Sequence, residues 1–236
     1  MKAKSTVDEI RARFDDDVER FANLETGQSA TIDAALVLDL VTATAARATP
    51  SACRVLDIGC GAGNYSIKLA GRLPEIDVDL VDLSQPMLDR ATERVGEATS
   101  GRVRAIQGNI RSLDFGAGQY DIVLAATVLH HLRDDDEWEA VFRSIRRALK
   151  PGGSFWISDL VAHDHTVIGD VLWERYGAHL SALRDDAYRD HVFAYIDRED
   201  SPRSVLYHVD LLRAVGFEWV EVVHKNGPFA ALGAGI

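Results

Sequence analysis

The sequence predicts an α/β fold with a doubly wound, mainly parallel sheet that carries helices on both faces. Two observations lead to this prediction. From Cys53 onward, short apolar segments alternate with longer amphipathic segments, which is the rhythm of strands joined by crossover helices. The apolar segments are also nearly continuous, which is typical of parallel strands buried on both faces.

Seven apolar segments are predicted to be strands. The first five follow one another in βα order, as in a Rossmann-like fold, and the last two form a closing hairpin. The fourth begins as a strand and turns at its end. The segments are residues 53–58, 78–83, 103–110, 120–132, 154–161, 218–225 and 228–236.

Helices are predicted between most of these strands. Residues 64–73 follow the first strand, and Ser84 is the expected N-cap of a helix over 85–98. Residues 134–150 form an amphipathic helix that the sequence Pro-Gly-Gly should end, and the last helix ends at Gly216.

The pattern divides one overall domain into four segments. The ends and the middle differ from the βα rhythm, because residues before 50 and between 163 and 203 are mostly helical. We expect an N-terminal helical cap (1–50), a binding core (51–162), a helical lid or substrate insertion after the fifth strand (163–203), and the last helix with the closing strands (204–236).

Composition and charge limit the kinds of partner that the chain is expected to bind. The net charge of −11 disfavours nucleic acid as a partner. No apolar run is long enough to span a bilayer and no signal-peptide core is visible, so we expect a cytoplasmic protein without a membrane partner. No metal site is predicted, because His163 and His165 have no third ligand nearby. The sequence leaves open whether the chain forms a homodimer.

The stretch "VLDIGCGAGNYS" raises the central question of which nucleotide the chain binds. A dinucleotide fingerprint places its third glycine at position 64, but Asn64 stands there and the glycine is Gly63. The loop is therefore G-x-G-x-G, preceded by the acidic Asp57. Asp82, at the end of the second strand, can bind both hydroxyls of a ribose, which fits either NAD or an adenosyl group.

Residues after the second and third strands suit an adenine ring. Asn109 can both accept from and donate to a base edge, and Ile110 lies beside it. Leu83 and Met87 offer apolar walls for the same ring.

At this point the chain resembles the class I S-adenosylmethionine-dependent methyltransferases. The motifs "VLDIGCGAG", "VDLS", "QGNI", "YDIVLAATVLHHL" and "LKPGGSFWISD" match that family in order between Arg54 and Asp159. The resemblance implies S-adenosylmethionine as cofactor and S-adenosylhomocysteine as product. It also implies that Asp82 binds the ribose, that Asn109 and Ile110 flank adenine, that Ala125 lines the methionine end, and that the glycine loop wraps the methionine part with Asp57, Gly59, Cys60, Gly61 and Gly63.

A weaker whole-chain resemblance is to the carboxy-S-adenosylmethionine synthase group. That group uses an arginine in the last helix for the extra carboxylate of its cofactor, and Leu211 stands at the equivalent position here. Arg213 lies two residues on, roughly 200° around the helix. Ordinary S-adenosylmethionine and a small-molecule acceptor are therefore favoured. A cofactor-modifying synthase, a tRNA or other methyltransferase and a non-catalytic binding module are the alternatives.

The acceptor side is less defined by the sequence. His130 and His131 follow the fourth strand, and a neutral imidazole there could take a proton from the acceptor, although "LHHL" could equally be a structural turn. Phe14 in the cap and three residues of the insertion are expected to form the acceptor pocket: Tyr176, Tyr195 and Arg198.

Overall fold

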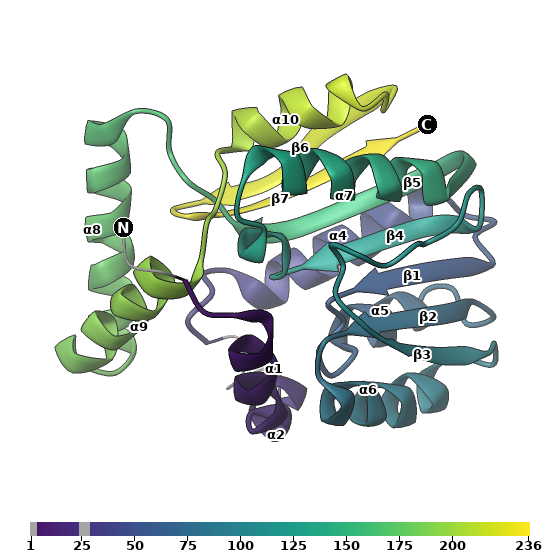
Figure 1. Ribbon diagram of the computed structural model, residues 1–236, viewed down its shortest axis with the longest axis horizontal. Helices are drawn as coiled ribbons and strands as arrows, with labels where there is room; N and C mark the ends of the chain where they lie inside the picture. Colours follow the sequence, from purple (N-terminus) through teal and green to yellow (C-terminus); the bar gives the residue numbers. More distant parts are fainter. Residues whose placement is uncertain (1–3, 24–28) are drawn as a thin grey trace.

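The computed structural model describes residues 4–23 and 29–236. Within these residues seven strands form a single sheet in the order β3-β2-β1-β4-β5-β7-β6 (Figure 1). The strands from β1 to β5 are parallel, and β7 runs antiparallel to both of its neighbours. Their bounds are β1 (Arg54–Ile58), β2 (Asp77–Asp82), β3 (Val103–Gln107), β4 (Tyr120–Ala126), β5 (Leu149–Leu160), β6 (Trp219–Asn226) and β7 (Phe229–Gly235). The predicted fold class is confirmed.

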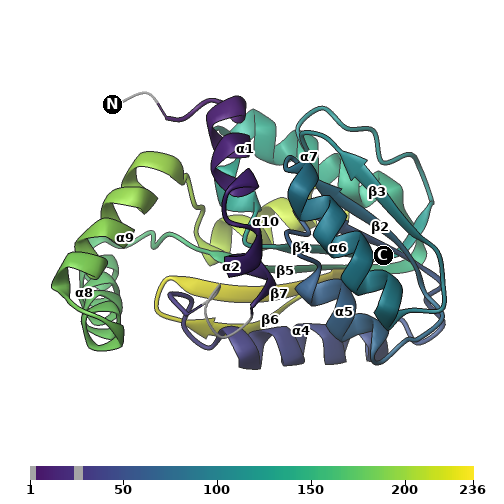
Figure 2. The same cartoon turned by 90° about the horizontal axis from the view of Figure 1, so that it is seen from below.

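Helices cover both faces of the sheet, as Figure 2 shows. On one face lie α4 (Ala34–Ala48), α5 (Asn64–Ala70) and α6 (Gln85–Ala98), whose apolar sides meet side chains such as Val55 and Leu80. On the other face α7 (Asp135–Ala148) and α10 (Val205–Ala214) pack against Val123 and Phe155. Both faces of the central strands are therefore buried, which explains their continuous apolar sequence.

Most element boundaries follow the sequence signals. The Ser84 side chain accepts a hydrogen bond from the amide of Met87 and so caps α6, as predicted. The Pro-Gly-Gly sequence does not separate α7 from the fifth strand. It lies inside β5, because Leu149 already pairs with Tyr120 of β4. The third strand ends early, at Gln107, so that Gly108, Asn109 and Ile110 leave the sheet.

The direction of strand order changes between β1 and β4. These two strands are neighbours, but their crossovers lead to opposite sides of the sheet, so a crevice forms beyond their carboxyl ends. The glycine loop after β1 and a short 3₁₀ helix, η1 (Leu129–His131), both lie at this crevice.

The helical ends of the chain gather beside that edge. The helices α1 (Val7–Asp15) and α2 (Val18–Ala22) lie against α6. The helices α8 (Thr166–Leu183) and α9 (Asp186–Glu199) project beyond the sheet (Figure 1). A small apolar core, with Tyr176 and Leu180 against Phe229, attaches them. No described helix is long and apolar enough to cross a membrane. The four-segment division stays a prediction.

Asp79 of β2 is the shared acceptor of a polar cluster formed by side chains of neighbouring strands. It accepts hydrogen bonds from Tyr120 Oη at 2.7 Å and from the guanidinium groups of Arg104 and Arg54, at 2.7 and 3.0 Å. Burial alone would raise the pKa of Asp79, but Arg104, Tyr120 and Arg54 outweigh it and lower the pKa. This stabilisation is present above the ordinary pKa of an aspartate and is lost as the pH falls through the lowered folded-state value.

We therefore predict that Asp79→Ala lowers the free energy of unfolding by about 2–3 kcal/mol, because it leaves the buried Tyr120 hydroxyl without its acceptor. Urea unfolding at pH 7 measures this change. The exposed Asp164→Ala is the control and should change stability by less than about 0.5 kcal/mol. Equal stability of the two variants would contradict this role for the cluster.

Candidate active site

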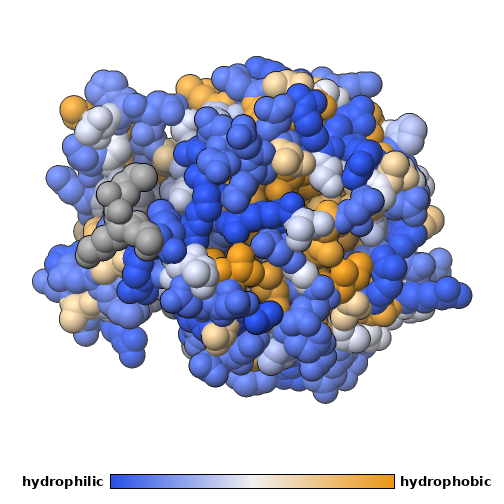
Figure 3. All heavy atoms as spheres, in the orientation of Figure 1, coloured by the Kyte–Doolittle hydropathy of each residue, from blue (hydrophilic) through white to orange (hydrophobic). Residues whose placement is uncertain are grey.

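A cavity lies at the crevice between β1 and β4. Apolar side chains gather in the middle of this face of the molecule, among polar ones (Figure 3). The cavity, here called the cofactor cavity, is lined by loops from four strand ends and by the N-terminal helices: Val7, Ile10, Phe14, Phe21, Asp57, Gly59, Cys60, Gly61, Ala62, Asn64, Tyr65, Asp82, Leu83, Met87, Gly108, Asn109, Ile110, Arg111, Ala126, Thr127, Val128, His131 and Leu132.

The glycine loop needs residues without side chains for two different reasons. Gly61 has φ +50°, and a Cβ placed on it would meet no atom within 4 Å, so the backbone itself forms the wall of the cavity. Gly63 has φ +82°, and its Cβ would lie 2.8 Å from Val95 Cγ2 of α6. Gly61 thus leaves room for a ligand, whereas Gly63 allows α5 to start close to α6.

Asp82 connects the glycine loop to the end of β2. Its Oδ2 accepts the amide of Gly61 at 2.9 Å, and its Oδ1 accepts the amide of Ser84 at 3.0 Å. Each carboxylate oxygen keeps a second lone pair for a ligand. Burial raises the pKa of Asp82. A buried acceptor beside an open backbone cradle and the apolar Leu83 and Met87 fits an adenosyl group.

Asp57 supports the loop from beneath. It is buried at the end of β1, and its Oδ2 accepts a 2.6 Å hydrogen bond from the hydroxyl of Ser66 in α5. Burial raises the pKa of Asp57 to about 6, although the Ser66 bond opposes this rise. Asp57 therefore fixes the start of α5 and leaves little of its carboxylate open to the cavity.

Most of the predicted cofactor residues line this cavity. The two that do not are Gly63, which lies behind the loop as the N-cap of α5, and Ala125, which faces the core beneath α7. Ala126 takes the place predicted for Ala125, because successive side chains of a strand point to opposite faces. The cavity also includes Val7, Ile10 and Phe21, residues that the sequence marks only as one face of a helical repeat.

A second, larger cavity of about 840 Å³ adjoins the first and is here called the acceptor cavity. It lies among α1, α2, α8, α9 and the carboxyl ends of β4 and β5. Aromatic side chains make up much of its wall, together with several charged ones. Its lining includes the predicted Phe14, Tyr176, Tyr195 and Arg198, and also Arg13, Asp17, Arg20, Phe21, Tyr188, His191, Asp200 and Phe229.

The N-terminal cap is tied to the insertion at this cavity. Arg13 of α1 donates a 2.9 Å hydrogen bond to Tyr195 Oη and forms a 3.2 Å ion pair with Glu199. Glu199 is fully buried and also accepts from the Ser5 hydroxyl at 2.9 Å. Arg198 pairs with the same carboxylate at 2.6 Å, so part of its charge is already balanced.

The two cavities meet at the end of β4. Phe14, Phe21, Thr127 and His131 line both of them. Thr127 has φ +53°, a left-handed conformation that a β-branched residue rarely adopts. Its amide donates to the Ser158 carbonyl at 2.7 Å, which holds this turn against β5. A ligand in one cavity is therefore in reach of a ligand in the other at this turn.

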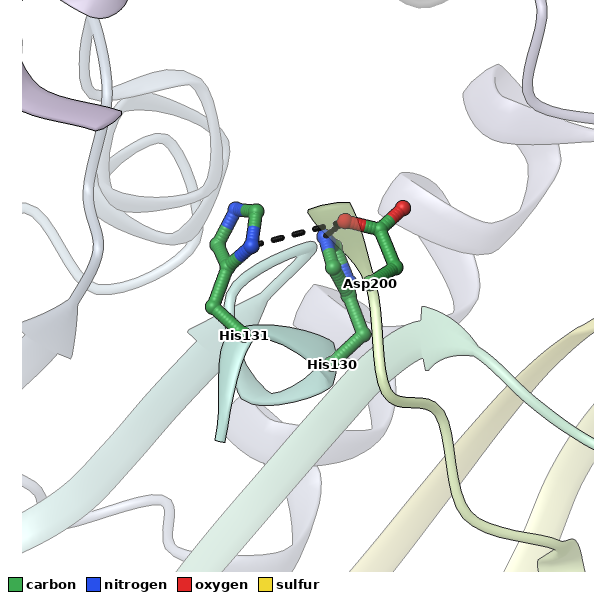
Figure 4. A group of neighbouring side chains, drawn as sticks. All are labelled: His130, His131 and Asp200. Carbon is green, nitrogen blue, oxygen red and sulfur yellow. Dashed lines mark ion pairs between the residues drawn. The ribbon is translucent and has the colours of Figure 1, made fainter. Parts of the chain in front are cut away.

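The neighbouring histidines differ in environment. His130 Nδ1 is hydrogen-bonded to Asp159, and its Nε2 lies 3.7 Å from Asp200 Oδ1 (Figure 4). Burial alone would lower the pKa of His130, but Asp159 and Asp200 outweigh it and raise the pKa to about 9. Burial, and next to it the positive charge of His130, hold the pKa of His131 well below its usual range.

Asp200 is the residue at this site that the sequence did not single out. Its Oδ1 lies 3.5 Å from His131 Nδ1 as well as close to His130. One possible ligand atom from each of the three side chains lies within 4.8 Å of the others, a group that could hold a metal ion. Asp200 follows α9 at the end of the insertion, so no local sequence pattern connects it to the two histidines.

Several known proteins that are similar to this chain are methyltransferases. A family model described as a methyltransferase domain matches residues 55–153. A demethylmenaquinone methyltransferase of Lactococcus lactis is 33% identical over 178 residues, which are 73% of this chain and 69% of that enzyme. An enzyme of the same name from Listeria welshimeri is 38% identical over 100 residues, and there the match spans only 41% of the relative's length.

A solved structure has the same fold along the whole chain. The 1,6-didemethyltoxoflavin-N1-methyltransferase of Burkholderia thailandensis, with bound S-adenosylhomocysteine, superposes with a TM-score of 0.65 at 19% identity. The superposition covers 100% of this chain and 92% of that one. The fold and the family model thus define an α/β methyltransferase. The chain belongs to the class I S-adenosylmethionine-dependent methyltransferases, and S-adenosylmethionine is its cofactor.

We predict that Asp82→Ala weakens binding of S-adenosylhomocysteine by about 2–3 kcal/mol, because a charge-assisted pair of hydrogen bonds to the ribose is lost. Isothermal titration calorimetry measures the dissociation constant. Asp89→Ala, at an exposed position on α6, is the control and should bind as the unchanged chain does. A folded Asp82→Ala with an unaltered dissociation constant would remove Asp82 from the ribose site.

Proposed function

We propose that this methyltransferase acts on a small, planar aromatic acceptor with ring oxygens, of the phenol or quinol type, seated in the acceptor cavity. The observation that carries the proposal is the junction at the end of β4, where His131, Thr127, Phe14 and Phe21 line both cavities. An acceptor on one side of this junction lies beside a cofactor on the other.

The chemistry of the acceptor cavity supports an aromatic acceptor. Tyr176, Tyr188, Tyr195 and Phe229 present ring faces and edges, against which a planar ring packs favourably. Arg13 and Arg20 offer donors for an anionic or carbonyl oxygen. The volume of about 840 Å³ is in the range of small-molecule sites.

The relatives support the same class of acceptor. The enzymes of Lactococcus and Listeria are named demethylmenaquinone methyltransferases, so the substrate in their name is a quinone. The acidic overall charge of this chain remains unfavourable for a tRNA acceptor.

The cofactor-modifying alternative finds less support. Of the described residues that line either cavity, none comes from α10, the helix that would have to hold an additional carboxylate. Leu211, at the position where the synthase group has its arginine, packs against the core instead.

Bound S-adenosylmethionine supplies a methyl group that its sulfonium has already activated. The task of the chain is to orient the acceptor toward that methyl at near-attack distance and to exclude water. Phe14 and Phe21 are placed to exclude water at the junction. His131 lines both cavities at the junction, whereas His130 lines only the acceptor cavity, so His131 is the histidine that can contact both ligands.

The direct test is methyl transfer from methyl-labelled S-adenosylmethionine to a panel of hydroquinones, naphthoquinols and phenols, with bulk tRNA as the competing substrate class. We expect labelled product with ring acceptors and none with tRNA. Label in tRNA alone would refute the proposal.

A variant connects this activity to the acceptor cavity. We predict that Tyr195→Ala raises the KM for the ring acceptor about tenfold, because a packing surface of the acceptor cavity is lost. Tyr207→Ala, on α10 outside both cavities, is the control for loss of a tyrosine. A KM that changes equally in both variants would place the acceptor elsewhere.

The cap and insertion should respond to ligands together. We predict that S-adenosylhomocysteine increases protection from hydrogen exchange in the α1 and α9 amides as well as in the glycine loop, because Arg13 ties α1 to Tyr195 and Glu199. Protection confined to the glycine loop would show that the two segments do not close over the cofactor.

A further inference from the structure

We propose that His130, His131 and Asp200 bind one divalent transition-metal ion, such as Zn²⁺, at the wall of the acceptor cavity. The site itself is argued from side-chain geometry alone. The role given to the ion below rests on the proposed function.

The spacing of the three side chains suits a common metal ion. Asp200 Oδ1 lies 3.5 Å from His131 Nδ1 and 3.7 Å from His130 Nε2, and Figure 4 shows both rings beside this oxygen. Two ligand atoms held tetrahedrally at about 2.1 Å from one zinc ion lie about 3.4 Å apart. The two distances from Asp200 are close to this value, and the ligand atoms of all three side chains lie within 4.8 Å of one another, so side-chain adjustments can bring them to one ion.

Two of the three ligand atoms are buried without a hydrogen-bond partner. These atoms are Asp200 Oδ1 and His131 Nδ1, and the Asp200 side chain is only 4% exposed. A buried polar atom without a partner costs about 1–3 kcal/mol. The two atoms lie 3.5 Å apart, and a cation bound to both would satisfy both at once.

His130 has the support that metal-binding histidines usually have. Its Nδ1 is hydrogen-bonded to the buried Asp159, which orients the ring and leaves Nε2 directed toward Asp200. A carboxylate behind a histidine in this way fixes its orientation and makes the other ring nitrogen a better ligand. Asp159 itself is held by the amides of Leu129 and His130 at 2.8 and 3.1 Å.

The local charge is compatible with a divalent ion. Asp159 and Asp200 supply two carboxylates within this group. Several cations of the described residues also lie near the group. Lys4, Arg133 and Arg111 bond to the backbone carbonyls of Asp200, Glu199 and His131, in that order. Arg13 pairs with Glu199.

The ligand set leaves a coordination position for the acceptor. All three side chains line the acceptor cavity, so the open side of the ion faces it, as in catalytic sites with three protein ligands. An oxygen of the acceptor can bind there and become more acidic. In this arrangement the histidines hold the ion and do not take the proton themselves. The acceptor would then be methylated at, or next to, an oxygen bound to the ion.

Metal binding is tested without any acceptor, so its outcome is independent of the proposed function. The chain, freed of metal with a chelator, is titrated with Zn²⁺ by calorimetry and with Co²⁺ by visible absorption. We expect one ion per chain and a Co²⁺ spectrum typical of nitrogen and oxygen ligands. In Asp200→Asn and His131→Gln the affinity should fall about tenfold or more.

Matched controls come from the same cavity. His191→Gln and Asp17→Asn remove a histidine and an aspartate of the acceptor cavity that lie outside the three ligands, and their Zn²⁺ affinity should be unchanged. Thermal unfolding and S-adenosylhomocysteine titration establish that each variant is folded. Absence of a Zn²⁺ site with micromolar or tighter affinity, or equal affinity in Asp200→Asn and His191→Gln, would overturn the proposal.

Discussion

The site depends on the hydrogen bonds that the buried carboxylate of Asp159 accepts. At the end of β5 it accepts the amides of Leu129, His130 and Leu160 and bonds the His130 ring. One side chain thereby fixes the turn that leaves β4, and with it the place where the two cavities meet. A buried charge is tolerated there because donors surround it. The crevice is general to doubly wound sheets, but its shape at this point depends on Asp159.

Most of the residues predicted to bind the cofactor line the cofactor cavity, because they lie at the ends of successive parallel strands. Asp82 is the last residue of β2, and Gly61 and Asn109 lie within three residues of the ends of β1 and β3. Parallel strands bring these carboxyl ends to one edge of the sheet. Ala125 lies in the core and its neighbour Ala126 lines the cavity, since successive side chains of β4 point to opposite faces of the sheet. Gly63 is required by helix packing and not by the cavity wall.

Only some residues of the acceptor cavity could be predicted from the sequence. Phe14, Tyr176, Tyr195 and Arg198 lie at the acceptor cavity, where the insertion was expected to contribute aromatic walls. Asp200 and Glu199 could not be found in the same way, because each acts through contacts with residues more than sixty positions away. Such pairings result from how the cap and the insertion dock, and hydrophobic periodicity describes neither.

The docking of α1 across both cavities also links the exchange of the two ligands. Phe14 lines the two cavities together, and Arg13 joins its helix to the buried Glu199. A segment shared in this way cannot withdraw from one ligand without uncovering the other. Opening of α1 would therefore expose both cavities at once, so the exchange of cofactor and the exchange of acceptor are coupled through one helix.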